Sequence, residues 1–173
     1  MTDTLQREFL AFSADKLREQ SGKIASCLGK LTGEQVWARG SDNQNAIGNL
    51  VLHLCGNVRQ WIISTVGGAA DVRQRDGEFA ARSGVPVPEL VERLHSTVEE
   101  AAAVLNSVTA ERLEQPLVIQ GYHVSGLLAI YHVVEHFSGH TGQIIFATKM
   151  LTGTDLGFYR HLSGTAAHGE KTP

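Results

Sequence analysis

Three of the eight histidines of this 173-residue chain stand four residues apart, at His132, His136 and His140. At about 100° per residue, steps of four place their imidazoles along one side of a helix, each about 40° from the next. The arc beside this stripe is apolar and consists of Ala129, Val133, Phe137, Ile144 and Leu151. The histidines therefore border a buried helix face. Neutral imidazole is the commonest protein ligand for divalent metals, so the stripe predicts a metal site.

His136 and His140 form the inner pair of the stripe. Residues i and i+4 of a helix are neighbours, so both rings can reach one ion, which then needs a third ligand from another helix. His53 is the best candidate, because it borders the apolar face of its own predicted helix in the same way. His132 either replaces one member of the pair or lies one turn further out, as a pocket wall or a donor to a ligand. Three neutral nitrogens leave positions open for water or substrate, as in catalytic sites.

Two amide side chains lie close to these histidines. Asn57 stands one turn after His53, and Gln143 lies about 20° from His136 on the helical projection. Either amide can hydrogen-bond a ligand ring or a substrate, although a plain buried polar contact is the commoner role of such residues. The remaining histidines are expected to be structural or solvated, and they are His95, His123, His161 and His168.

Four long amphipathic segments must position these side chains. Apolar residues recur at helical spacing over residues 3–31, 44–66, 88–107 and 124–151, with little strand signal between them. This pattern predicts an all-α domain, a four-helix bundle in which sites are built by side chains that project inward from facing helices.

The connections and the end of the chain carry weaker signals. The connection at 34–43 allows a short helix, as does the charged stretch at 69–88, which would cover the bundle. Residues 117–119 and 122–124 predict a small hairpin around Gly121. We expect the bundle to occupy residues 1–153 and the tail, 154–173, to be partly packed on it through an apolar patch of Leu156, Phe158, Tyr159 and Leu162.

The composition is that of an ordinary globular protein, 42% hydrophobic and 19% charged, with a net charge of −3. This balance gives no reason to expect nucleic acid or an anionic membrane as a partner. The N-terminal residues predict neither a signal peptide nor a membrane span. Cys27 and Cys55 have no metal-ligand spacing and indicate no disulfide scaffold, so we expect a cytoplasmic protein.

The motif HxxxHxGQI, which starts at His136 on the last predicted helix, and His53 within NLVLHLCGNVRQWI together resemble the DinB/YfiT-like metalloenzymes. The likeness extends from the first helix to about Gly153. The RDGEF run at Arg75 and the DLGFY run at Asp155 are similar to those of a bacterial branch of that superfamily with no assigned function.

The resemblance implies a bundle in up-down-down-up order, with a long crossover between its second and third helices. It also implies a divalent metal held by His53, His136 and His140, and a homodimer. Three imidazoles accept Zn, Ni or Fe(II), so the metal is left open. Members of the superfamily include transferases and isomerases that use a low-molecular-weight thiol such as mycothiol or bacillithiol.

We therefore expect a metal-dependent enzyme that acts on a small molecule, in the first place a thiol-dependent transferase. The alternative enzyme is a metal-dependent hydrolase, which needs a general base. No carboxylate is predicted beside the histidine stripe, and Glu135 falls on the opposite side of the helix. A non-catalytic, stress-related bundle that binds a metal or ligand is the hypothesis from another class.

Overall fold

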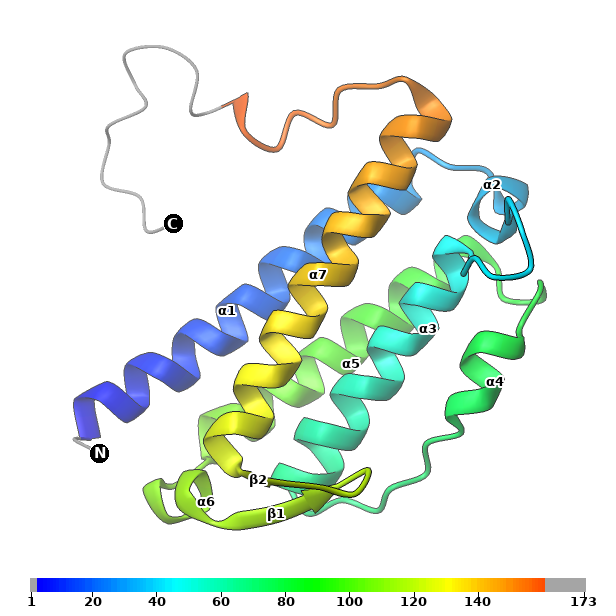
Figure 1. Cartoon of the computed structure of the whole chain (residues 1–173). Coiled ribbons are helices and arrows are strands. Elements are labelled where there is room, and N and C mark those ends of the chain that lie inside the picture. The colour runs from blue at the N-terminus through cyan, green and yellow to red at the C-terminus, as the bar shows by residue number, and fades with distance from the viewer. Residues whose placement is uncertain (1–2, 161–173) are drawn as a thin grey trace.

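The computed structural model describes residues 3–160, and in this part of the chain four long helical segments lie side by side (Figure 1). The four segments are α1 (Asp3–Leu28), α3 (Ile47–Val58), which continues into the π-helix η1 (Arg59–Val66), α5 (Val87–Ser107) and α7 (Gly126–Thr152). The described chain is thus mostly helical, as the apolar spacing predicts. The first helix ends three residues earlier than expected, where Gly29 follows Leu28.

The buried face of α7 fixes the rotation of that helix against α1 and α3. Ala129, Val133, Phe137 and Ile144, four residues of the predicted apolar arc, are fully buried. The fifth, Leu151, lies near the end of the helix and is exposed, which corrects the predicted arc. With these four side chains in the core, the edge of α7 that carries the histidines must lie toward α3.

The second predicted helix differs from the expected 44–66. It begins at Ile47, and its last eight residues wind as a π-helix, in which the amide of Gly67 donates to the carbonyl of Ile62 at 2.8 Å. The hydroxyl of Thr65 donates to the carbonyl of Gln60 at 2.8 Å. A short π-helical segment cannot be distinguished from an α-helix by the spacing of its apolar residues. The sequence therefore predicts one uniform helix. Such segments recur at functional sites.

The connection from η1 to α5, residues 67–86, is here called the strap. It contains a short helix, α4 (Arg75–Ala80), which lies alongside α3 (Figure 1). The amide of Asn49 on α3 donates to the carbonyls of Glu78 and Ala81 at 2.8 and 2.9 Å. Arg39, which follows the short helix α2 (Gly33–Trp37), donates to the carbonyl of Phe79 at 2.9 Å. These bonds fix α4 against the helix that carries His53.

A two-stranded hairpin closes one end of the molecule, after the short helix α6 (Ala110–Glu114). β1 (Pro116–Ile119) and β2 (Tyr122–Ser125) pair antiparallel, with Ile119 opposite Tyr122. The two turn residues, Gln120 and Gly121, both have positive φ, as a two-residue hairpin turn requires. The hairpin is therefore confirmed at the predicted position.

The described part of the tail follows Gly153, which ends α7 in the left-handed conformation. Leu156 and Phe158 are partly buried against the core, whereas Tyr159 is exposed. Leu162, the fourth residue of the predicted patch, lies outside the described residues. Within residues 3–160, no helix combines the length and apolar character that crossing a membrane requires.

Candidate metal centre

Two helices bring three of the predicted histidines together. The side chain of Ser125 caps the first turn of α7, which carries His136 and His140, and α3 carries His53. The ring of His53 is buried, with 7% of the residue exposed, whereas His136 and His140 are partly buried. The three rings lie edge to face, with centroids 4.5 to 5.2 Å apart. The cluster therefore lies at the inner edge of the α3–α7 contact.

The facing ring nitrogens are close enough to share one ion. Nε2 of His136 lies 3.0 Å from Nε2 of His53 and 3.1 Å from Nε2 of His140. One candidate ligand atom from each ring falls within 4.8 Å of the other two. Three nitrogens bound to one Zn²⁺ at about 2.0–2.1 Å in tetrahedral geometry are separated by about 3.3 Å. The residues present thus fit a divalent metal.

Burial keeps the α7 rings neutral, which is the state in which imidazole binds a metal. Burial, and then the neighbouring charges of His140 and His53, lower the pKa of His136 to about 3. The pKa of His140 is also lowered, chiefly by burial. At neutral pH, neither ring needs to lose a proton before its nitrogen can donate an electron pair to a metal.

A carboxylate from the strap orients the ring of His53. Oε2 of Glu78 lies 3.1 Å from Nδ1 of His53, and Nη2 of Arg73 lies 3.2 Å from the same nitrogen. In the tautomer with the proton on Nδ1, an ionised Glu78 accepts that N–H and Nε2 is free to bind a metal. Gly56, one turn after His53, makes room for this contact, because a Cβ at that position would overlap Oε1 of Glu78. The expectation that no carboxylate lies near the histidines is therefore wrong.

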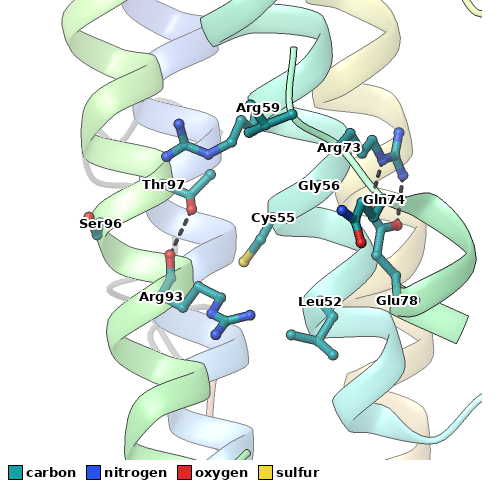
Figure 2. A pocket seen from close by; sticks show the side chains of 12 residues that line it. Leu52, Cys55, Gly56, Arg59, Arg73, Gln74, Glu78, Arg93, Ser96 and Thr97 are labelled. Carbon is teal, nitrogen blue, oxygen red and sulfur yellow. Dashed lines mark hydrogen bonds and ion pairs between the residues drawn. The ribbon is translucent and has the colours of Figure 1, made fainter. Parts of the chain in front are cut away.

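Arg73 holds Glu78 in its ionised form. Nε and Nη2 of Arg73 donate to the two carboxylate oxygens of Glu78 at 2.8 Å each (Figure 2). Both side chains are nearly buried, 3% and 10% exposed. Burial raises the pKa of Glu78, but the hydrogen bonds from Arg73 and His53 outweigh it, and the pKa lies below its ordinary value. Both oxygens are therefore occupied by fixed partners.

Gln143 orients His140 on the other side of the cluster. Its Oε1 lies 2.8 Å from Nδ1 of His140 and accepts that N–H, so Nε2 of His140 faces the cluster with its lone pair. Nδ1 of His136 is buried and has no hydrogen-bond partner among the described residues.

His132 stands apart from the cluster as part of a pocket wall. Its ring lies 5.5 Å from that of His136 and 4.3 Å from that of Trp61, centroid to centroid, and the planes of His132 and Trp61 are tilted by 42°. Burial lowers the pKa of His132, so this ring is also neutral at neutral pH. Of the two interpretations of His132, the observed position matches the one in which it lies one turn out from the pair.

A cavity of about 450 Å³ opens beside the cluster, between α3, α7, the strap and the hairpin. Asn57 and Trp61, both 4% exposed, line it with three of the histidines, His53, His132 and His136. Asn57 Oδ1, Trp61 Nε1 and His136 Nδ1 are buried without a hydrogen-bond partner in the described chain. Buried polar atoms without a hydrogen-bond partner are rare in folded proteins. Three of them around one cavity indicate that a ligand or water forms hydrogen bonds there.

A second cavity, of about 490 Å³, lies on the other side of Arg73, between α3 and α5 (Figure 2). Its arginines are already engaged, since Arg59 pairs with Glu100 and Arg93 with Glu89. Burial raises the pKa of the Cys55 thiol in its wall to about 12, so the thiol is protonated and unreactive. The chemistry is concentrated on the histidine side.

The model of a family described as "Protein of unknown function (DUF1572)" matches residues 4–164. The chain belongs to the DUF1572 family. No curated protein matches it.

Two solved structures share the fold of this DUF1572 protein. A structure described as a conserved protein of locus from Enterococcus faecalis has a TM-score of 0.72 at 12% identity, covering 89% of this chain and 99% of its own. A DinB-like protein, YjoA, from Bacillus subtilis has a TM-score of 0.65 at 17% identity, covering 85% and 96%. The predicted resemblance to a DinB-like protein is thereby confirmed for the fold, and at these identities it extends no further.

Sequence reasoning missed three residues of this DUF1572 site: Arg73, Arg75 and Glu78. All three lie on the strap. No local sequence pattern predicts that these side chains will contact α3. The available signal for Arg75 and Glu78 was the RDGEF run, which places acidic and basic side chains on a short helix, and Arg73 lies two residues before that run. His95 and His123 lie outside the cluster, and His161 and His168 lie outside the described residues.

Proposed function

We propose that this protein is a metal-dependent enzyme that acts on a small molecule through a divalent ion held by His53, His136 and His140. The observation that supports this most is the convergence of three imidazole nitrogens within 4.8 Å at the wall of a 450 Å³ cavity. Zn, Ni and Fe(II) all suit such a ligand set, which leaves coordination positions open. When bound, the ion lowers the pKa of a thiol or a water and polarises a carbonyl.

A thiol-dependent transfer, with a mycothiol- or bacillithiol-type cofactor, is the reaction that we favour. His132 is neutral and lines the cavity beside His136, so its ring can accept the thiol proton. Trp61 and Tyr122 line the same space, and Asn57 offers an unpaired carbonyl oxygen to orient a substrate. The electrophile would then receive the sulfur atom while its leaving group departs.

Hydrolysis is less well supported, although Glu78 lies close to the cluster. Its two oxygens are occupied by Arg73 and by His53 Nδ1, on the side of the His53 ring that faces away from the other histidines. A carboxylate so held positions the ring and is poorly placed to take a proton from a water in the cavity.

Elemental analysis of purified wild-type protein tests the metal directly. We expect about one divalent ion per chain in the wild type, little in His136→Ala, and wild-type content in His132→Ala, the matched change one turn away. Equal metal content in wild type and His136→Ala would overturn the proposal.

Substrate panels then test the reaction. Stabilisation of the metal-loaded protein by low-molecular-weight thiols in a thermal-shift screen supports the transferase. Turnover of esters or amides, with no effect of thiols, would instead identify a hydrolase. A protein that retains its metal tightly but responds to neither panel would be the non-catalytic, stress-related binding bundle.

We further propose that the four long segments form one bundle domain, residues 1–153, in up-down-down-up order, with 154–173 as its tail. In Figure 1, α1 and α7 run opposite to α3 and α5, and the strap supplies the long crossover, in support of this order. Cys27 and Cys55 are free and buried, which favours a reducing, cytoplasmic environment.

A homodimer through the outer face of α7 completes the proposal. Leu128 and Tyr131 at one end of this face and Phe146 and Met150 at the other are large, apolar and exposed. Gly139 lies between them, and Leu128 and Met150 each stand eleven residues from it. A two-fold axis near Gly139 would therefore pair the two ends with those of an antiparallel second copy.

A further inference from the structure

Arg75 differs from the other arginines of the described chain. It is the only arginine in residues 3–160 whose guanidinium makes neither a hydrogen bond nor an ion pair. The others each bond to a carboxylate, a side-chain amide or a main-chain carbonyl, and they are Arg7, Arg18, Arg39, Arg59, Arg73, Arg82, Arg93, Arg112 and Arg160. An exposed guanidinium with free donors suits an external anion.

The aromatic ring of Phe79 fixes Arg75 close to the histidine cluster. Cζ of Arg75 lies 4.9 Å from the Phe79 ring centroid, and the same ring lies 4.7 Å from that of His53. Arg75, Phe79 and His53 thus form a stack from the mouth of the cavity to the metal ligands. Stacking on an aromatic face leaves the N–H edges of a guanidinium free to bind an anion.

The wall of the histidine-side cavity has a positive charge excess. Two of its residues, Arg73 and Arg75, are arginines, and no Asp or Glu lines it. Glu78 neutralises Arg73 from behind, whereas Arg75 has no such partner. A divalent metal at the histidines would add to the positive potential. An anionic molecule is therefore attracted to this space, and a cationic one is repelled.

We infer that the substrate or thiol cofactor of this site carries a carboxylate and that Arg75 binds it, while a donor atom of the same molecule reaches the histidine cluster. This inference rests on the proposed function. The apolar part of the cavity wall, formed by Trp61, Tyr122 and Val124, suits a short apolar body between the two polar ends. Arg75 is thereby the residue that selects for charge.

Calorimetric titration of the full-length, metal-loaded protein with 3-mercaptopropionate and with 3-mercaptopropionamide tests this inference. The two compounds share a thiol and differ only in the charge of the other end. We expect the acid to bind about tenfold more tightly than the amide, because a guanidinium–carboxylate contact is charge-assisted. Arg75→Gln should abolish this preference, and Arg75→Lys should retain part of it.

Arg59→Gln is the matched control, because it removes the same charge from the wall of the neighbouring cavity. It should keep the preference for the acid. Each of three results would overturn the inference alone. The wild type could bind the acid and the amide with equal affinity, protein that retains its metal could bind neither compound, or Arg75→Gln could keep the preference for the acid. Absence of metal from the wild-type protein would overturn the proposed function as well, so elemental analysis of each sample separates the two failures.

Discussion

The carboxylate of Glu78 lies 3.1 Å from Nδ1 of His53, although the two residues are separated by 25 positions and belong to different elements. An ionised carboxylate can only accept, so this contact favours a proton on Nδ1 of His53, and it competes there with Nη2 of Arg73, a donor 3.2 Å from the same nitrogen. The lone pair on Nε2 is then directed at His136. The strap is therefore part of the candidate metal centre, and a substitution in the strap should change the affinity for the metal.

Glu78→Gln should weaken metal binding about tenfold or more, since partners of this kind typically contribute 10- to 100-fold to metal affinity. Competition with a chelator measures the affinity. Asp76→Asn, an exposed charge change on the same short helix, should leave it unaltered.

The change also leaves Arg73 without an ion-pair partner in a nearly buried position, which destabilises the fold. Helical circular dichroism and the free energy of unfolding of the metal-free protein separate that effect from metal binding. Glu78→Asp provides a second test, because it keeps the charge beside Arg73 but shortens the reach toward His53. Wild-type metal affinity in both folded variants would refute the role of Glu78.

The long helices could be predicted from the sequence because their signal is local. Apolar side chains at helical spacing must share one face, and Phe137 and Ile144 are buried as that rule requires. The same rule puts His136 and His140 on one edge of α7. The hairpin was also predictable, because Gly121 supplies the positive φ that its turn needs.

The short helix of the strap was expected within residues 69–88, and α4 lies there, alongside α3. The side-chain contacts of the strap and the π-helix could not be predicted in the same way, because both depend on contacts between distant segments. Nothing around Glu78 indicates that its carboxylate will reach α3, and nothing around Gly56 indicates that the space of its missing side chain will be filled. The bulk of Trp61 is compatible with a core or a pocket, and the π-helical turn places it at the wall of the cavity beside His132.

Gly56→Ala should displace Glu78 and weaken the site without touching any ligand. The new Cβ would overlap Oε1 of Glu78, so the carboxylate must withdraw from His53. We expect a loss of metal affinity in the same range as for Glu78→Gln and a destabilisation of about 1–3 kcal/mol from overpacking.

Gly22→Ala is the matched control for this substitution, because a Cβ built at that position in α1 meets nothing within 4 Å beyond the adjacent residues and the local helix backbone. It should stabilise the protein by about 0.5–1 kcal/mol, the usual gain for this change within a helix, and leave metal affinity unchanged. Urea unfolding measures the stability of both variants, and competition with a chelator measures their metal affinity. Equal metal affinity in Gly56→Ala and wild type would show that Glu78 does not depend on the gap at Gly56.

The metal-free protein should become less stable as the pH falls from about 7 to about 5. His136 has a folded-state pKa of about 3, against about 6.5 in an unfolded chain, so below about pH 6.5 the unfolded state binds more protons. The stability contributed by the neutral ring is complete above that pH and is lost as the pH falls toward 3.

We expect His136 to account for about 1 kcal/mol of this loss, less than the full shift implies, because a half-buried ring retains part of its hydration. Denaturant unfolding at the two pH values measures it. His136→Asn removes the titrating group, so its free energy of unfolding should fall less than that of wild type over the same interval. The same fall in both proteins would mean that His136 is not held neutral by its surroundings.

Phe146→Glu should convert the proposed dimer to a monomer. The substitution places a carboxylate in the apolar contact between the Phe146 end of one copy and the Tyr131 end of the other. Because the interface is two-fold symmetric, this buried charge occurs twice. Phe12→Glu is the matched control, since Phe12 is also an exposed aromatic residue, on α1 rather than α7. Multi-angle light scattering should give the mass of two chains for wild type and Phe12→Glu, and of one chain for Phe146→Glu. If wild type has the mass of one chain, or if Phe146→Glu keeps the mass of two, this face of α7 is not the interface, and its apolar side chains need another explanation.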